Sequence, residues 1–286
     1  MTTVVSFIKG HGTGNDFVIL PDDEAQLHVT IAQIRHICDR HLGIGADGIL
    51  RVVPAALSNE PEVVAQASVA HWFMDYRNSD GSIAEMCGNG VRVFAHYLFT
   101  THRAAGDEVF IATRGGIKRV YKTSDGLYAV EMGRWQPIPT LAPVAVHIDE
   151  QVWSAMAVAM PNPHAVVFVE DLNQAGTLLN IPLVTPAETY PDGVNVEFVV
   201  ERGNNHVAMR VYERGVGETL SCGTGACAVA IAARRRVHAE GDTRWQVDVP
   251  GGTLWIEEND DREITLVGPA EIVAEGTITL LGTHEF

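Results

Sequence analysis

The sequence predicts an α+β fold built from two similar halves. One unit, a strand, a turn, a cysteine-glycine motif and a helix, occurs twice along the chain, and most other strand-like segments are short and bounded by turns. A proline-rich segment at 133–143, GRWQPIPTLAP, is the natural linker between the halves. With 286 residues, the chain is long enough for two domains of ordinary size.

The domain boundaries follow from the linker and from the last apolar run of the chain. We expect an N-terminal domain over residues 1–134 and a C-terminal domain over 135–271. The apolar run GTITLLG favours a final strand within about 272–286 that returns to the first domain.

The repeated unit is centred on two cysteines, each placed directly before Gly-x-Gly. They are Cys87 in MCGNGVRVFAHYL and Cys222 in SCGTGACAVAIAA. Each follows a strand-like segment, WFMDYRN (72–78) or VAMRVYER (207–214), through a turn that contains glycine. Each then runs into an apolar segment that predicts a helix. When the cysteines are aligned, Met74 falls on Met209.

Two further segments are predicted near the N-terminus. The stretch FIKGHGTGNDFVIL (7–20) predicts a strand, a glycine turn and a second strand. The following stretch, VTIAQIRHICDRHLGIG, predicts a helix that begins after Thr30 as N-cap and stops at Gly43. Its apolar stripe comprises Ile31, Ile34, Ile37 and Cys38.

The segment GIGADG (43–48) matches the glycine spacing of a dinucleotide-binding loop. Such a loop follows a strand and opens a helix. Here a predicted helix precedes the glycines and the strand-like ILRVV follows them. This reversed order argues against nucleotide binding.

Composition narrows the class of protein. The net charge is −16, which disfavours nucleic acid and anionic membranes as partners. The start of the chain lacks the pattern of a signal peptide, and the longest apolar run, Ala226–Ala233, is far shorter than a membrane span. We therefore expect a cytoplasmic protein whose four cysteines are thiols.

The setting of Cys87 and Cys222 predicts acid–base chemistry. Glycines before a helix expose backbone N–H groups, and the positive end of the helix dipole favours both a thiolate and a bound carboxylate. Two such motifs facing each other would flank one carbon, so that one thiolate removes a proton while the opposite thiol delivers one. That arrangement predicts a racemase or epimerase that acts at an α-carbon without a cofactor.

Other interpretations stay open at this point. Both cysteines can be small residues that pack helix starts, or metal ligands together with a histidine, although no typical ligand spacing supports a metal. A thiol–disulfide redox protein would favour a C-x-x-C, which the chain lacks. A further alternative is a non-catalytic amino-acid-binding protein of the same fold. Cys38 and Cys227 lie in apolar stretches and are expected in the core.

Several polar residues outside the cysteine motifs suit a zwitterionic ligand. An arginine binds a carboxylate through two hydrogen bonds, and a glutamate accepts from an ammonium group. The candidates are Asn78, Asn162, His164, Asn195, Glu213 and Arg214.

Over nearly its whole length the chain resembles diaminopimelate epimerases. The resemblance rests on KGHGTGNDFV, GIGADG, YRNSDGSIAEMCGNGVRVFAHYL, NPHAVVFV, YPDGVNVEF, RVYERGVGETLSCGTGACAVA and VPGGTLWI. The long ERGVGET-x-SCGTG block is highly specific. Proline and hydroxyproline racemases share the paired-cysteine fold, but MCGNG and the lead-in to the second cysteine match the diaminopimelate enzymes better.

The resemblance implies a fold and an activity. The fold is two similar domains, each a curled, mostly antiparallel sheet around a central helix, with the active site in the cleft between them. The activity is interconversion of LL- and meso-diaminopimelate for lysine and peptidoglycan synthesis, without pyridoxal phosphate, metal or another cofactor. Members of the family are commonly homodimers.

The resemblance also implies a role for individual residues. Cys87 and Cys222 correspond to the two acid/base residues, and His164 and Glu213 to residues that support them. The positions that hold the reacting carboxylate are Gly88, Asn89, Gly223 and Thr224. The positions that hold the remaining substrate groups are Asn15, Asn78, Asn162, Asn195, Glu213 and Arg214.

Two positions depart from the family pattern. Gly48 stands where some members carry a glutamine, and Pro161 stands where glycine is usual. Because proline fixes φ and lacks a donor, we expect the loop that carries Asn162 to be less adaptable.

Overall fold

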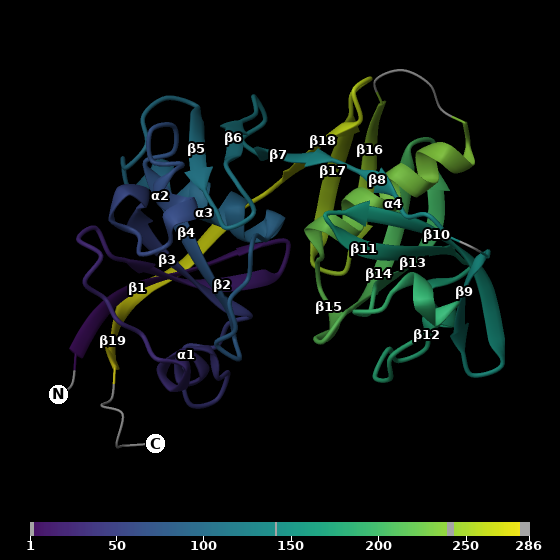
Figure 1. Cartoon of the computed structure of the whole chain (residues 1–286), viewed down its shortest axis with the longest axis horizontal. Helices are drawn as coiled ribbons and strands as arrows, with labels where there is room; N and C mark the ends of the chain where they lie inside the picture. The colour runs from purple at the N-terminus through teal and green to yellow at the C-terminus, as the bar shows by residue number, and fades with distance from the viewer. Residues whose placement is uncertain (1–2, 141, 239–242, 281–286) are drawn as a thin grey trace. The chain divides into compact units, whose positions relative to one another are not determined.

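The computed structural model describes residues 3–140, 142–238 and 243–280. The chain divides into two compact units: unit 1 contains residues 1–130 and 269–286, and unit 2 contains residues 131–268. Figure 1 labels the helices and strands of both units. The predicted α+β class is confirmed, because sheets with few helices dominate both units.

Unit 1 is a mixed sheet with one long helix. Its strands are β1 (Thr3–Gly12), β2 (Asn15–Pro21), β3 (Gly48–Pro54), β4 (Trp72–Asn78), β5 (Glu108–Ala112), β6 (Lys118–Lys122) and β19 (Glu271–Leu280), and β7 (Tyr128–Arg134) crosses into unit 2. Its helices are α1 (Ile31–Cys38), the short η1 (Ala55–Leu57) and α2 (Pro61–Val64), and α3 (Gly88–Thr100). The C-terminal strand β19 pairs with β1, which confirms that the last apolar run returns to this unit as far as Leu280; the rest of the predicted strand lies outside the described residues.

Unit 2 has the same plan. Its strands are β8 (Gln136–Pro137), β9 (Val144–Ile148), β10 (Gln151–Met160), β11 (Asn162–Phe168), β12 (Leu183–Thr185), β13 (Asn195–Gly203), β14 (His206–Glu213), β15 (Gly217–Thr219), β16 (Thr243–Val249), β17 (Gly252–Glu258) and β18 (Glu263–Gly268). Its long helix is α4 (Gly223–Arg236), and its short ones are η2 (Leu172–Ala175) and η3 (Ala187–Thr189).

The strand pairings confirm the predicted internal repeat. In unit 1, neighbours from β1 to β6 pair antiparallel, parallel, antiparallel, parallel and antiparallel. In unit 2, the strands β10, β11, β13, β14, β16 and β17 repeat this series in the same order. Strands β2 and β11 each begin with an asparagine, at Asn15 and Asn162, and bury the same positions. The repeat therefore gives a register for comparing residues of the two units.

A long helix begins at each cysteine motif and packs inside its own unit. Helix α3 contacts β1, β2, β5, β6 and β19, and α4 contacts β10, β11, β13, β14, β16, β17 and β18. Almost every residue of α3 is buried, and so is α4 from Gly225 to Ala233. Small residues dominate the buried part of α4, so the surrounding strands approach it closely on several sides.

Helix α1 begins as predicted and ends earlier. Thr30 caps it, and its side chain accepts a hydrogen bond from the backbone N–H of Gln33. The helix stops at Cys38, and Gly43 lies in the turn beyond, where a Cβ would come 1.8 Å from the carbonyl oxygen of His36. Gly43 thus lets the turn pass close to the backbone of α1 at His36, and the helix itself has already ended at Cys38. The predicted apolar stripe is wrong at Ile31, which is 55% exposed.

The proline-rich segment is not a simple linker, which corrects the prediction. It contains the end of β7 and all of β8, and β8 pairs with β10. Trp135 is buried and donates its indole N–H to Glu258 at 2.7 Å. The segment is therefore anchored in unit 2 by strand pairing and by a buried side chain.

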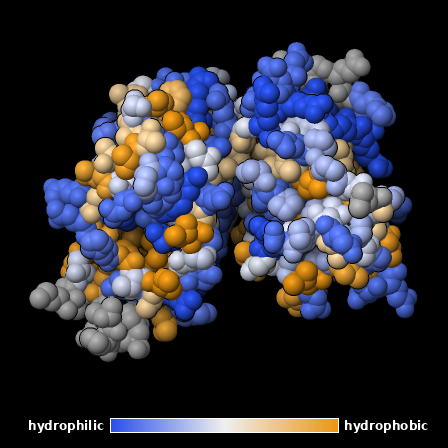
Figure 2. All heavy atoms as spheres, viewed as in Figure 1, coloured by the Kyte–Doolittle hydropathy of each residue, from blue (hydrophilic) through white to orange (hydrophobic). Residues whose placement is uncertain are grey.

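The surface of each unit is mainly polar. Figure 2 shows hydrophilic residues over much of both units on the viewed face, with hydrophobic residues in small groups. The helices in the described ranges include none that is long and apolar enough to cross a membrane.

Candidate functional site

In unit 1, Cys87 is the N-cap residue of α3 and is half-buried. Its thiol donates to Oδ1 of Asn15, with 3.4 Å between the sulfur and the oxygen. The same oxygen accepts from Nδ2 of Asn89 at 3.2 Å. Three predicted site residues therefore meet at one point, because the start of β2 lies against the first turn of α3. Gly88, also predicted, is buried in that turn.

The orientation of Asn15 is set by a carboxylate that the sequence reasoning did not include. Nδ2 of Asn15 donates to Oδ2 of Asp47 at 2.7 Å, so the amide oxygen is turned toward Cys87. Burial raises the pKa of Asp47 above its usual value. Arg40 holds both Asp47 and Asp16. Although burial acts in the opposite direction, the hydrogen bonds from Arg40 and Lys9 lower the pKa of Asp16 to about 2.

A fully buried arginine lies in the first turns of α3. Arg92 donates to Oδ1 of Asn89 at 3.0 Å and to the carbonyl oxygen of Pro269 at 3.2 Å. It thereby fixes the Asn89 side chain, whose Nδ2 shares an acceptor with the Cys87 thiol. The sequence reasoning treated this helix as apolar and did not identify the arginine.

In unit 2, Cys222 caps α4 and is only 5% exposed. Its sulfur accepts from the backbone N–H of Gly225 at 3.4 Å and lies 3.5 Å from Oγ1 of Thr224. The prediction of thiolate character is wrong here. Burial, with the negative charges of Glu213 and Glu197, raises the pKa of Cys222 well above its ordinary value, and this outweighs the helix N-terminus.

Glu213 stands beside Cys222, as its predicted supporting role requires. Its negative charge acts to raise the pKa of Cys222, and the carboxylate accepts a hydrogen bond from the hydroxyl of Thr219. Burial raises the pKa of Glu213, while the hydrogen bond from Thr219 acts to lower it. The second cysteine motif thus places a buried thiol near a carboxyl group whose charge disfavours the thiolate.

His164 and Glu197 form a buried pair beneath the start of α4. Nδ1 of His164 lies 2.6 Å from Oε1 of Glu197, and both side chains are completely buried. Nε2 of His164 lies 3.1 Å from Oδ1 of Asn162. The sequence analysis named His164 and Asn162 and missed Glu197. A signal exists in YPDGVNVEF, where a glutamate occupies a position that alternation places on the inner face with Asn195.

Two further predicted residues of unit 2, Asn195 and Arg214, are linked by a hydrogen bond from side chain to backbone. Oδ1 of Asn195 accepts from the backbone N–H of Arg214 at 2.8 Å. The guanidinium of Arg214 is exposed and donates to the carbonyl oxygen of Asp192 at 2.9 Å. Asn195 is the first residue of β13. Gly223 is buried in the first turn of α4.

Asn78 and the two departures from the family pattern have local explanations. Nδ2 of Asn78 bonds to Oγ of Ser82 at 2.9 Å, within its own turn. A Cβ at Gly48 would come 2.5 Å from the carbonyl oxygen of Arg77, so this backbone leaves no room for a longer side chain. Pro161 is exposed at the turn between β10 and β11, directly before Asn162.

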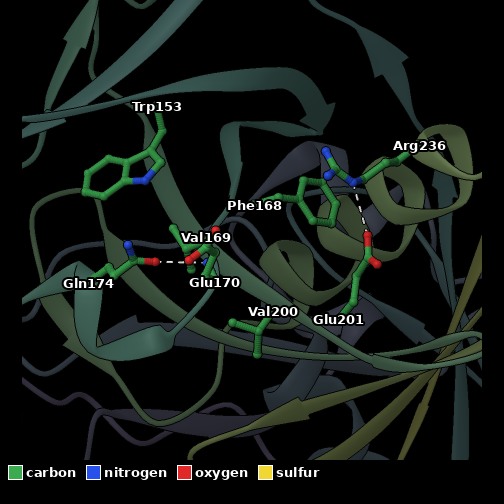
Figure 3. Close-up of a pocket in the computed structure, with 8 residues that line it drawn as sticks. All are labelled: Trp153, Phe168, Val169, Glu170, Gln174, Val200, Glu201 and Arg236. Carbon is green, nitrogen blue, oxygen red and sulfur yellow. Dashed lines mark hydrogen bonds and ion pairs between the residues drawn. The ribbon is translucent and has the colours of Figure 1, made fainter.

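The pocket drawn in Figure 3 does not contain the candidate site. It has a volume of about 730 Å³ and belongs to unit 2. Its lining residues are Trp153, Phe168, Val169, Glu170, Gln174, Val200, Glu201 and Arg236. Arg236 pairs with Glu201 at 3.0 Å, and none of the predicted site residues lines it. Within the described part of the chain, no group of three or more His, Cys, Asp or Glu residues could hold a metal ion.

Solved structures of other proteins define the class by its fold. The chain is similar to a PhzF-family phenazine biosynthesis protein from Bacillus anthracis, with a TM-score of 0.68 at 14% identity over 96% of this chain and 99% of the other. It is also similar to a hydroxyproline epimerase from Agrobacterium vitis, with a TM-score of 0.66 at 14% identity over 98% of this chain and 94% of the other. The fold is therefore that of the paired-domain proteins that include hydroxyproline epimerase, here with a cysteine at the start of each long helix.

Sequence comparison gives the family. The family model of diaminopimelate epimerase matches residues 7–138 and 156–273. The chain is 54% identical to a diaminopimelate epimerase of Streptomyces coelicolor, covering 96% of each chain. It is 44% identical to that of Thermobifida fusca, covering 96% of this chain and 98% of the relative. The chain belongs to the diaminopimelate epimerase family.

Proposed function

We propose that this protein interconverts LL- and meso-diaminopimelate by inverting one α-carbon. The observation that carries the proposal is that Cys87 and Cys222 each cap a buried helix that begins with Gly-x-Gly, in a chain of this family. The exposed N–H groups of such a helix start suit a carboxylate whose negative charge grows as the α-proton leaves.

The two thiols would share the proton transfer. One cysteine, as thiolate, takes the α-proton from one face, and the other, as thiol, gives a proton to the opposite face of the planar carbanion. The reaction is balanced because one thiolate becomes a thiol while one thiol becomes a thiolate. Gly88, Asn89, Gly223 and Thr224 would bind the reacting carboxylate through helix N–H groups and side chains.

The residues around each cysteine support distinct roles. The Cys87 thiol is hydrogen-bonded to Asn15, whereas Cys222 lies within the influence of the Glu213 and Glu197 charges. The remaining substrate groups, including the distal amino-acid end, would be bound by polar residues: Asn15, Asn78, Asn162, Asn195, Glu213 and Arg214. No cofactor is needed for this scheme, and we propose a cytoplasmic homodimer as the working form.

The direct test is to incubate the protein with LL-diaminopimelate in nearly pure deuterated water. We expect meso product that carries deuterium at the inverted carbon from the first turnover, and a substrate pool that stays protiated at low conversion. Proton NMR and mass spectrometry of both isomers measure this. Binding without turnover would overturn the activity, and protiated meso product would overturn the two-thiol scheme.

A further inference from the structure

The internal repeat identifies an ionisable pair in unit 2 whose matched positions in unit 1 are apolar. Phe17 is the third residue of β2, and His164 is the third residue of β11. In the same way, Leu50 is the third residue of β3, and Glu197 is the third residue of β13. Strands β2 and β3 pair in the same parallel register as β11 and β13. The apolar pair Phe17 and Leu50 thus corresponds to the ionisable pair His164 and Glu197.

Both pairs lie under the same turn of their helix. A Cβ at Gly90, three residues after Cys87, would touch Phe17 at 3.4 Å and Leu50 at 3.5 Å. A Cβ at Gly225, three residues after Cys222, would come 2.9 Å from Oε1 of Glu197 and 3.3 Å from the Cys222 sulfur. Apolar packing is therefore enough to support this turn in unit 1, so support of the helix does not explain the pair in unit 2.

The hydrogen bonds fix the ring of His164 in one orientation. Oδ1 of Asn162 can only accept, so Nε2 of His164 carries a hydrogen. One further hydrogen lies between Nδ1 and Oε1 of Glu197. A ring held at both nitrogens can neither flip nor exchange its tautomer freely.

Glu197 depends on this histidine. Its side chain is completely buried, and among the described residues Oε2 has no hydrogen-bond partner. A buried carboxyl group held by one bond is costly, and such groups are retained where they serve a site. Nearby, the pKa of Cys222 is raised by burial and by the charges of Glu213 and Glu197.

We propose that Glu197 is a positioning residue of the second cysteine motif, which holds His164 with Nε2 on Asn162 and thereby orders the groups around Cys222. The expected change in kcat rests on the proposed epimerase activity. The expected change in the His164 ring does not depend on that activity, so the proposed function and the positioning role of Glu197 can fail separately.

The test compares three variants of the full chain. Glu197→Gln keeps the shape of the side chain, and Glu197→Leu copies the residue found in unit 1. Glu201→Gln is the matched control, because Glu201 lies on the same strand, is exposed and pairs with Arg236. Nitrogen-15 NMR of the histidine rings reports the state of each nitrogen, with His164 assigned by the loss of its signals in His164→Gln.

We expect the Nδ1 signal of His164 to shift in both Glu197 variants and to stay unchanged in Glu201→Gln. We also expect kcat for diaminopimelate to fall about 10- to 100-fold in Glu197→Gln, the loss of one hydrogen bond to a charged group, with KM nearly unchanged. If Glu197→Leu does not fold, Glu197→Gln alone decides.

Support requires both changes in an active wild-type enzyme. An unshifted Nδ1 signal in Glu197→Gln, or a shifted signal with normal kcat, overturns the proposal. A wild-type protein without epimerase activity would refute the proposed function instead, and the Nδ1 signal would then decide by itself whether Glu197 orients His164.

Discussion

The two cysteine motifs have the same backbone and opposite chemical surroundings. In unit 1, Cys87 is half-buried and bonds to an amide, and the buried group in the helix behind it is the cation of Arg92. In unit 2, Cys222 is almost fully buried and lies near two carboxyl groups, the half-buried Glu213 and the fully buried Glu197.

The difference shows what a repeated scaffold does and does not impose. Strand order, register and a helix that begins at the cysteine are common to both units, so the two thiols occupy matching positions on matching backbones. The charges around them are set by side chains that differ at matched positions. The four predictions that follow test this contrast.

The largest effect is expected from removing either thiol. Cys87→Ala and Cys222→Ala should each lower epimerisation by about 10²- to 10⁴-fold, because general acid–base catalysis is worth that much and one thiol cannot serve both faces. Initial rates with LL-diaminopimelate measure the loss, and circular dichroism checks the fold.

Cys38→Ala and Cys227→Ala are the controls. Both thiols are buried in the core, and burial raises the pKa of Cys38 to about 12, so it stays an inert thiol. We expect a loss of stability of about 1 kcal/mol and retained activity. An inactive Cys227→Ala with an active Cys222→Ala would show that the wrong thiol has been assigned.

Removal of the Arg214 guanidinium should have the next largest effect. Arg214→Ala should raise the barrier reflected in kcat/KM by roughly 2–5 kcal/mol, the cost of truncating a charged contact to the distal end of the substrate. Arg202→Ala is the control, because Arg202 is exposed on β13. Comparable turnover of free alanine and diaminopimelate by the wild type would contradict this role.

A smaller effect is expected on the reactivity of Cys222. Because the charge of Glu213 contributes to the raised pKa of this thiol, Glu213→Gln should lower that pKa and increase the thiolate fraction at any pH below it. Alkylation of Cys222 should then speed up by up to about tenfold for each unit that the pKa falls.

Peptide mass spectrometry after iodoacetamide treatment at several pH values measures this rate. Cys87 is the internal control: its thiol is hydrogen-bonded to Asn15 of its own unit, and we expect its alkylation rate to stay unchanged. Slower labelling of Cys222 in the variant would mean that the carboxyl group favours the thiolate and that the stated sign is wrong.

The smallest effect is expected at the support of Asn15. The substitution Asp47→Asn replaces the carboxylate that accepts from Nδ2 of Asn15 with an amide, which offers either an oxygen or an NH₂ group at that place. The Asn15 side chain, whose Oδ1 accepts from the Cys87 thiol, can then rotate. We expect kcat to fall about fivefold, in line with about 1 kcal/mol for a partly exposed hydrogen bond. Asp23→Asn, which alters an exposed pair with Arg103, should leave kcat unchanged. Equal effects of Asp47→Asn and Asp23→Asn on kcat would show that Asp47 does not support the site.

The elements and the pair of cysteines were predictable from the sequence because their signals are local. The segments 72–78 and 207–214 were predicted as strands, glycine marked the turns, and an apolar run after each Cys-Gly-x-Gly marked the helices. The roles of single site residues came from long motifs shared with a family, and they remain proposals that the variants above test.

Local signals failed where the outcome depends on what packs against a segment. The proline-rich segment was predicted as a linker, but the burial of Trp135 and the pairing of β8 with β10 tie it to unit 2. Ile31 fits a helical stripe and is still 55% exposed, although the turn at Gly81 lies against it.

The sequence by itself determined the α+β class, the repeat, the two helix-capping cysteines and the family. Only the tertiary structure decided the charge around each thiol. Glu197 meets His164 across 33 positions of sequence through the parallel pairing of β13 with β11. The pKa of Cys222 rises because burial and two carboxyl groups outweigh the helix N-terminus. Burial and long-range register are properties of the packed chain, and no local pattern contains them.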